Sequence, residues 1–166
     1  MTCIVLVGMP GAGKSTLGVL LAKATMKDFV DTDMIIQLRA NQSLQDIVDN
    51  SGYLTLRQLE EVVLLDLDVQ QHVIATGGSV VYSEKGMAQL KSLGPVVYLQ
   101  VSLDELKRRV KDLPSRGIAA TPGKTLDDLY EERCPLYERY ADVVVNCDGK
   151  TPEQVVDEIV QAVAAR

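Results

Sequence analysis

Short apolar runs alternate with longer amphipathic stretches along the whole chain. The apolar runs have the length and continuous hydrophobicity of strands that are buried on both faces, and they are Cys3–Val7, Asp28–Asp31, Val73–Thr76, Val96–Val101 and Val143–Val145. The stretches between them have helical patterns, at Lys14–Thr25, Asp33–Ala40, Ser43–Val48, Thr55–Val69, Ser83–Ser92, Ser102–Lys111, Thr125–Tyr140 and Thr151–Ala164. This alternation predicts an α/β fold in which helices cover both faces of a parallel sheet.

Some local features support these helices without pointing to a function. Ser102 and Glu105 have the spacing of a capping box, and Thr151 precedes a first-turn proline. Within Thr55–Val69 the apolar positions recur on one face of the helix, at Leu56, Leu59, Val63 and Leu67. The pattern therefore predicts that this face packs against a core.

Length, composition and charge restrict the classes of function. A chain of 166 residues is expected to form one domain, and its 46% apolar and 24% charged residues are ordinary for a globular protein. The net charge of −6 argues against binding to nucleic acid or to an anionic membrane, which favours a basic surface. An anionic substrate would therefore have to be attracted by local cations.

The cysteines and the N-terminus bear on the compartment. Cys3, Cys134 and Cys147 are odd in number and form no C-x-x-C pair, so neither a disulfide framework nor a zinc site is favoured. The first predicted strand begins at once, which leaves no room for a signal peptide. No apolar run approaches the roughly 18 residues of a membrane span. We therefore expect a cytoplasmic protein with no membrane and no nucleic-acid partner.

The segment Gly8–Ser15 fits the phosphate-binding pattern G-x-x-x-x-G-K-[ST], between a predicted strand and a predicted helix. Glycines allow successive backbone N–H groups to turn toward a phosphate, and the following helix directs its positive dipole end at the same anion. Lys14 would reach the outer phosphates and the Ser15 hydroxyl would contact Mg²⁺. The alternative is a glycine-rich turn that matches by chance.

Two carboxylates follow the second predicted strand. Residues two apart in an extended chain point to the same side, so Asp31 and Asp33 are expected to face one crevice beyond the carboxyl ends of the strands. One could hold Mg²⁺ or its waters while the other accepts a proton from a substrate hydroxyl. The alternative is a solvated turn in which Asp33 caps the next helix.

Other candidate residues carry weaker signals. Arg57 lies near the start of the helix Thr55–Val69, where Glu60 or Glu61 could orient it, and Arg133 lies in a charged helix; both could equally be surface residues. Gly77 and Gly78 follow the third strand, where adjacent glycines suggest a close approach of ligand to backbone, or a plain turn. The irregular loop 112–124 could be a lid over a triphosphate or a mobile surface loop. The single histidine, His72, has no partner in the pattern.

Taken together, these motifs resemble those of the shikimate kinase family, nearly from end to end. The resemblance rests on the order and spacing of Gly8–Thr16, Asp31–Asp33, Arg57 with its following acids, Thr76–Gly78, Arg116 and Arg133–Tyr137. Two positions depart from the family's pattern. Ser79 stands where a third glycine is usual, and Arg116-Gly117-Ile118 stands where Arg-Pro-Leu is usual.

The resemblance implies a P-loop fold of the nucleoside-monophosphate-kinase type, with a five-stranded parallel sheet in the order 2-3-1-4-5. It implies one kinase domain over 1–166, with substrate-binding helices at about 33–60 and a lid at about 112–124. The reaction would be transfer of the ATP γ-phosphoryl group to the 3-hydroxyl of shikimate, by a monomer that needs Mg²⁺.

The resemblance also implies roles for individual residues. The catalytic group would be Lys14, Asp33 and Arg116, and the metal would be held by Ser15 and Asp31. The acid would be bound by Asp33, Arg57, Gly77, Gly78 and Arg133. ATP would be bound by Gly11, Ala12, Gly13, Lys14, Ser15, Thr16, Arg109, Arg116 and Thr151. Paired guanidiniums suit a planar carboxylate better than lysine does.

Other functions of the same fold remain alternatives. A kinase of another small hydroxy acid, such as gluconate, would keep the phosphate loop and the arginines. A nucleoside monophosphate kinase is disfavoured by the short segment between Asp33 and Arg57. A guanine-nucleotide switch would need an Asn-Lys-x-Asp segment, which the sequence lacks.

Overall fold

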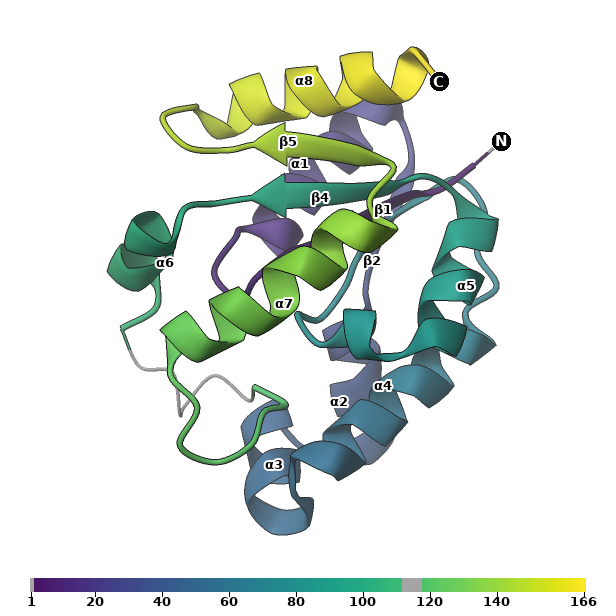
Figure 1. The fold of residues 1–166 in the computed structure, drawn as a ribbon. Coiled ribbons are helices and arrows are strands. Elements are labelled where there is room, and N and C mark those ends of the chain that lie inside the picture. Colours follow the sequence, from purple (N-terminus) through teal and green to yellow (C-terminus); the bar gives the residue numbers. More distant parts are fainter. Residues whose placement is uncertain (1, 112–117) are drawn as a thin grey trace.

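The computed structural model describes residues 2–111 and 118–166 (Figure 1). The described strands are β1 (Ile4–Val7), β2 (Asp28–Asp31), β3 (His72–Ala75), β4 (Val96–Gln100) and β5 (Val143–Asn146). They form one parallel sheet in the order β2-β3-β1-β4-β5, which confirms the order that the resemblance implied.

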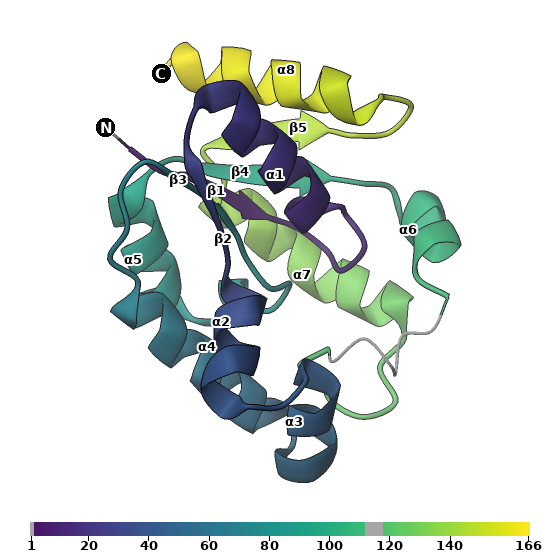
Figure 2. The ribbon, with the colours of Figure 1, turned by 180° about the vertical axis from the view of Figure 1, so that it is seen from behind.

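Helices lie on both faces of this sheet, as Figures 1 and 2 show from opposite sides. The described helices are α1 (Lys14–Thr25), α2 (Thr32–Ala40), α3 (Leu44–Ser51), α4 (Tyr53–Asp66), the short 3₁₀ helix η1 (Val80–Tyr82), α5 (Glu84–Leu93), α6 (Leu103–Arg109), α7 (Leu126–Tyr140) and α8 (Pro152–Ala164). Helices α1 and α8 cover one face, and α5 and α7 cover the other. The central strands are therefore enclosed, which explains their continuous apolar runs.

The main core is centred on β1, whose four residues are all buried. Val5 pairs with Ile74 of β3 on one side and with Val96 of β4 on the other, so β1 lies in the middle of the sheet. Because the chain leaves each parallel strand at the same edge, the segments that follow β1, β2 and β3 are brought together there. These segments carry most of the candidate residues.

A second, smaller core joins α2, α3 and α4 next to the β2 edge of the sheet (Figure 2). Its buried side chains include Ile36 of α2, Ile47 of α3, and Leu56 and Val63 of α4. Ala119, from the segment 118–124, is buried in the same cluster. This core packs α4, which carries Arg57, against α2 and α3.

The predicted elements agree with the structure to within a few residues. Helix α1 and strand β2 have the predicted bounds, and Thr151 caps α8 through a capping box that it forms with Gln154. The prediction for Ser102 was only half right, because its hydroxyl accepts from the Glu105 N–H while the Glu105 carboxylate pairs with Arg109. No helix in the described part of the chain is long and apolar enough to span a bilayer.

Candidate active site

The loop between β1 and α1 has the backbone shape that anion binding requires. Gly11 and Gly13 adopt left-handed φ angles of +86° and +92°. A Cβ on Gly11 would also lie 2.5 Å from a methyl carbon of Val110, so this position is closed to other residues by both backbone and packing. Gly13 is the N-cap of α1 and supplies no side-chain cap, which leaves the first N–H groups of the helix for a ligand.

Lys14 is buried beside this loop, with 9% of its surface exposed. Its Nζ donates to the carbonyl oxygens of Gly8 at 2.7 Å and Met9 at 3.0 Å. Burial lowers the pKa of Lys14 to about 8, against the opposing effect of the nearby Asp33 carboxylate. The ammonium therefore remains mostly charged at neutral pH and is held at the mouth of the loop.

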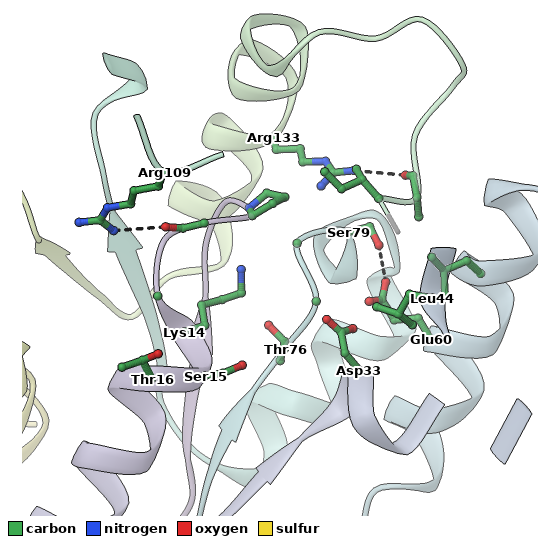
Figure 3. A pocket seen from close by; sticks show the side chains of 18 residues that line it. Lys14, Ser15, Thr16, Asp33, Leu44, Glu60, Thr76, Ser79, Arg109 and Arg133 are labelled. Carbon is green, nitrogen blue, oxygen red and sulfur yellow. Dashed lines mark hydrogen bonds between the residues drawn. The ribbon is translucent and has the colours of Figure 1, made fainter. Parts of the chain in front are cut away.

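A cavity of about 400 Å³ opens next to the loop, at the carboxyl ends of the strands (Figure 3). It is lined by Pro10, Gly11, Gly13, Lys14, Ser15, Thr16, Asp33, Leu44, Leu56, Glu60, Thr76, Gly77, Gly78, Ser79, Arg109, Ile118, Ala119 and Arg133. In Figure 3 the acids Asp33 and Glu60 face Lys14 across this space, and Arg133 points in from α7. The volume is that of a site for a small ligand.

Two acids lie beside Gly77, of which Glu60 is buried and Asp33 is half-buried. A Cβ on Gly77 would lie 2.5 Å from Glu60 Oε2 and 2.7 Å from Asp33 Oδ1, so the glycine leaves room for both carboxyl groups. Burial, with help from the charge of Asp31, raises the pKa of Asp33 to about 6. Burial raises the pKa of Glu60 to about 7, although the hydroxyl of Ser79 donates to Glu60 Oε1 at 2.7 Å and opposes that rise.

Arg57 and Arg133 converge on one oxygen atom. The Nη2 atom of each lies 3.2 Å from the carbonyl oxygen of Ala119. Arg133 is only 1% exposed, and no carboxylate of the described residues forms an ion pair with it. The Nε of Arg57 is buried without a hydrogen-bond partner in the described structure. Two cations that share one neutral acceptor, Arg133 buried and Arg57 half-buried, are poised to bind an anion.

The predicted metal ligands lie in contact beside the loop. Ser15 Oγ donates to Asp31 Oδ2 at 2.6 Å, so the hydroxyl and the carboxylate lie next to each other. Hard oxygen ligands of this kind fit Mg²⁺, which is commonly held by one or two carboxylates together with substrate phosphates. Within residues 2–111 and 118–166 no group of three His, Cys, Asp or Glu side chains could hold a metal.

The structure corrects the reasoning that placed Asp31 and Asp33 together. Strand β2 ends at Asp31 and α2 begins at Thr32, so the two acids do not alternate along one strand. Asp31 caps α2 by accepting from the Asp33 N–H at 2.9 Å. The alternative prediction from the sequence placed a helix cap at this turn, but assigned it to Asp33. Asp33 lies in the first helical turn and lines the cavity, while Asp31 turns toward Ser15.

The acids that were expected to orient Arg57 do not do so. Glu60 accepts from Ser79, and Glu61 accepts from Ser83 at 2.5 Å. Arg57 instead lies over the ring of Tyr82, with its guanidinium carbon 3.9 Å from the ring centroid. Sequence spacing favoured the i,i+3 and i,i+4 acids, but both turn to serines that follow β3.

The remaining predicted residues divide into two groups. Arg109 lines the cavity, and its Nη1 donates to the carbonyl oxygen of Gly11 at 3.2 Å (Figure 3). Ala12, Asp31, Arg57 and Thr151 lie outside the described lining, and Thr151 is occupied as the cap of α8. Arg116 lies outside the described residues.

Glu60 is the main site residue that the sequence interpretation missed. It is 4% exposed and lies on the face of α4 that buries Leu56 and Val63. A glutamate that interrupts an apolar helical stripe must be buried with the stripe, so the pattern did contain a signal for it. Ser79 and Ala119 gave no such signal, because their contacts depend on distant elements.

A phosphate-binding loop in a 2-3-1-4-5 parallel sheet, beside a small cavity lined by acids and arginines, defines a P-loop kinase of small molecules. A family model described as shikimate kinase matches residues 10–164. The chain belongs to the shikimate kinase family.

Individual relatives agree with this assignment over nearly the whole length. The chain is 37% identical to a shikimate kinase of Vibrio parahaemolyticus, over 98% of this chain and 96% of the relative. The structure resembles that of a shikimate kinase from Acinetobacter baumannii in complex with shikimate, with a TM-score of 0.88, 28% identity and coverage of 99% and 94% of the two chains. It also resembles the shikimate kinase of Aquifex aeolicus, with a TM-score of 0.85, 34% identity and coverage of 98% and 96%.

Proposed function

We propose that this chain transfers the γ-phosphoryl group of ATP to the 3-hydroxyl of shikimate, giving shikimate 3-phosphate and ADP. The observation that carries the proposal is the convergence of Arg57 and Arg133 on one oxygen in a cavity that the phosphate loop also lines. A substrate carboxylate would replace that carbonyl oxygen and bring the negative charge that the two arginines lack.

On the ATP side, the backbone N–H groups of Gly11–Thr16 would bind the phosphates. Lys14 would exchange its contacts with the Gly8 and Met9 carbonyls for phosphate oxygens, and Arg109 would bind near the loop that it already contacts. Ser15 and Asp31 would hold Mg²⁺, which when bound neutralises charge on the phosphates. Positioning and charge stabilisation of this kind provide most of the catalysis in phosphoryl transfer.

On the acid side, Asp33 would accept the proton of the 3-hydroxyl. The hydroxyl oxygen would form the new bond to the γ-phosphorus, and the bond from that phosphorus to the β-phosphate bridging oxygen would break. With a pKa of about 6, the Asp33 carboxylate is mostly ionised at neutral pH and is more basic than an ordinary aspartate. Gly77 and Gly78 would contact the substrate through their backbone.

Several finer parts of the proposal come from the sequence. The chain would form one kinase domain over 1–166, in which α2–α4 hold the acid. Arg116 and Thr151 would take part in ATP binding. The cytoplasmic location and the monomeric state also stay predictions.

An acid-panel assay tests the proposed function. ADP release from Mg·ATP would be followed by a coupled assay with no acid, with shikimate and with gluconate at matched concentrations. We expect shikimate alone to stimulate ADP release strongly, and mass spectrometry should find one added phosphate on the acid. Equal or greater stimulation by gluconate would favour the alternative kinase, and one constant rate with every acid would rule out both.

A further inference from the structure

Tyr82 lies between the two arginines of the acid site. It is the last residue of η1, and its ring contacts both Arg57, which lies on α4, and Arg133, which lies on α7. The guanidinium carbon of Arg57 lies 3.9 Å from the ring centroid, and that of Arg133 lies 5.3 Å away. One half-buried ring thus contacts both cations that share the Ala119 carbonyl.

The hydroxyl of Tyr82 determines which donors of Arg133 remain for a ligand. Arg133 Nε donates to Tyr82 Oη at 3.2 Å, and Tyr82 Oη donates to Glu132 Oε1 at 2.8 Å. Glu132 in turn accepts a hydrogen bond from Lys124. Tyr82 therefore fixes the Nε edge of the guanidinium, so that the Nη atoms are left near Ala119 and Gly78.

The ring also offsets the electrostatic repulsion between the two guanidinium groups. Two like charges around a single acceptor repel each other, and no described carboxylate is ion-paired with either of them. The negative face of an aromatic ring attracts a guanidinium without neutralising it. A tyrosine can therefore hold both arginines in place and leave their charge available to a carboxylate, which an acidic residue could not do.

We infer that Tyr82 is a positioning residue that presets Arg57 and Arg133 for the carboxylate of the acceptor acid. The inference rests on the proposed function, since it takes a carboxylate as the group that the arginines bind. Tyr82 acts through the arginines and not on the phosphates, so it affects the affinity for the acid and not the affinity for ATP.

The test is a pair of substitutions that separate the ring from the hydroxyl. Tyr82→Leu removes both, and we expect the KM for shikimate to rise about 10-fold, a typical effect of losing two cation–ring contacts. Tyr82→Phe keeps the ring, and we expect a rise of about threefold, as for one lost hydrogen bond. In both variants kcat and the KM for ATP should stay close to those of the wild type. Calorimetric titration with shikimate should show the same order of Kd values.

Tyr140→Leu is the matched control, because Tyr140 also contacts an arginine, at 5.4 Å, but that arginine is Arg139, which lies outside the cavity lining to which Arg133 belongs. It should leave the KM for shikimate unchanged. An unchanged KM in Tyr82→Leu, or an equal rise in the KM values for shikimate and ATP, would overturn the inference. Should Tyr82→Leu not fold, Tyr82→Met replaces it as the variant without the ring, and a wild-type KM there would overturn the role of Tyr82. A wild-type protein that ignores shikimate would instead refute the proposed function itself.

Discussion

The phosphate loop and the acid site are built in different ways. In the loop, Lys14 bonds to Gly8 and Met9, six and five residues away, and the backbone supplies the remaining donors. In the acid site, Arg57 and Ala119 are 62 residues apart, and side chains from α2, α4, η1 and α7 must meet. The loop is therefore specified locally, whereas the acid site depends on the packing of the whole fold. This difference predicts that changes at the two sites will affect kcat and KM separately.

The largest expected effect is on the phosphate side. Lys14→Ala should lower kcat about 1,000-fold, because a buried cation that stabilises charge on the transferred group is lost. The KM for shikimate should change little, which would show that the two sites act separately. Coupled ADP-release assays at saturating substrates would measure this. Lys23→Ala, on the exposed side of α1, is the control, and a wild-type kcat in Lys14→Ala would contradict the assigned role.

The next effect is on the acid side. Arg133→Ala should raise the KM for shikimate by a factor corresponding to about 2–3 kcal/mol, with Arg57 left to hold the carboxylate. Arg139→Ala on the same helix should not change this KM. Thermal melts of both variants would separate a binding defect from unfolding. If Arg133→Ala binds shikimate with the wild-type KM, the paired-arginine interpretation is wrong.

The third effect is a pH dependence that belongs to the acid site. Because burial raises the pKa of Asp33 to about 6, the carboxylate becomes protonated as the pH falls through that value and can no longer accept a proton. The kcat/KM for shikimate should therefore fall below about pH 6, approaching tenfold per pH unit. An ordinary aspartate would keep its activity to about pH 4. A profile that stays flat down to that pH would exclude Asp33 as the base.

The smallest effect concerns Ser79. Its hydroxyl lowers the pKa of Glu60, so Ser79→Ala should raise that pKa further above its ordinary value. We expect a loss in kcat/KM at neutral pH of about threefold, consistent with one hydrogen bond. A more protonated Glu60 carries less negative charge beside Asp33, so the acidic limb set by Asp33 should shift to lower pH. Ser83→Ala removes the similar bond to Glu61 and the cap of α5. It should lower stability but leave the pH profile in place, and identical profiles for all three proteins would exclude the role of Ser79.

The sequence predicted the fold well because the fold depends on local patterns. Buried parallel strands are continuous apolar runs, and the phosphate loop is a contiguous motif, so both could be recognised within short windows. The bounds of α1 and β2 were predicted correctly for this reason. The turn after β2 was not, because the capping of α2 by Asp31 ends the extended conformation one residue earlier than strand alternation assumed.

The acid site could be predicted only in part. The resemblance supplied Asp33, Arg57 and Arg133, but their partners depend on segments far apart in the chain. Tyr82 is an ordinary aromatic residue after a strand, and nothing around it in the sequence shows that two helices bring arginines to its ring. Spacing rules describe neighbours on one helix, and the decisive contacts here are between elements.

Gly77 shows how one position can be constrained entirely by its neighbours. Its φ angle is not in the left-handed region, so its own backbone would accept a side chain. What forbids one is the space that the oxygens of Asp33 and Glu60 occupy. Asp33 and Glu60 thus determine which residues are tolerated at position 77. As long as both acids are present, substitution of Gly77 is disfavoured. A homologue that lost the two acids could replace the glycine with a larger residue.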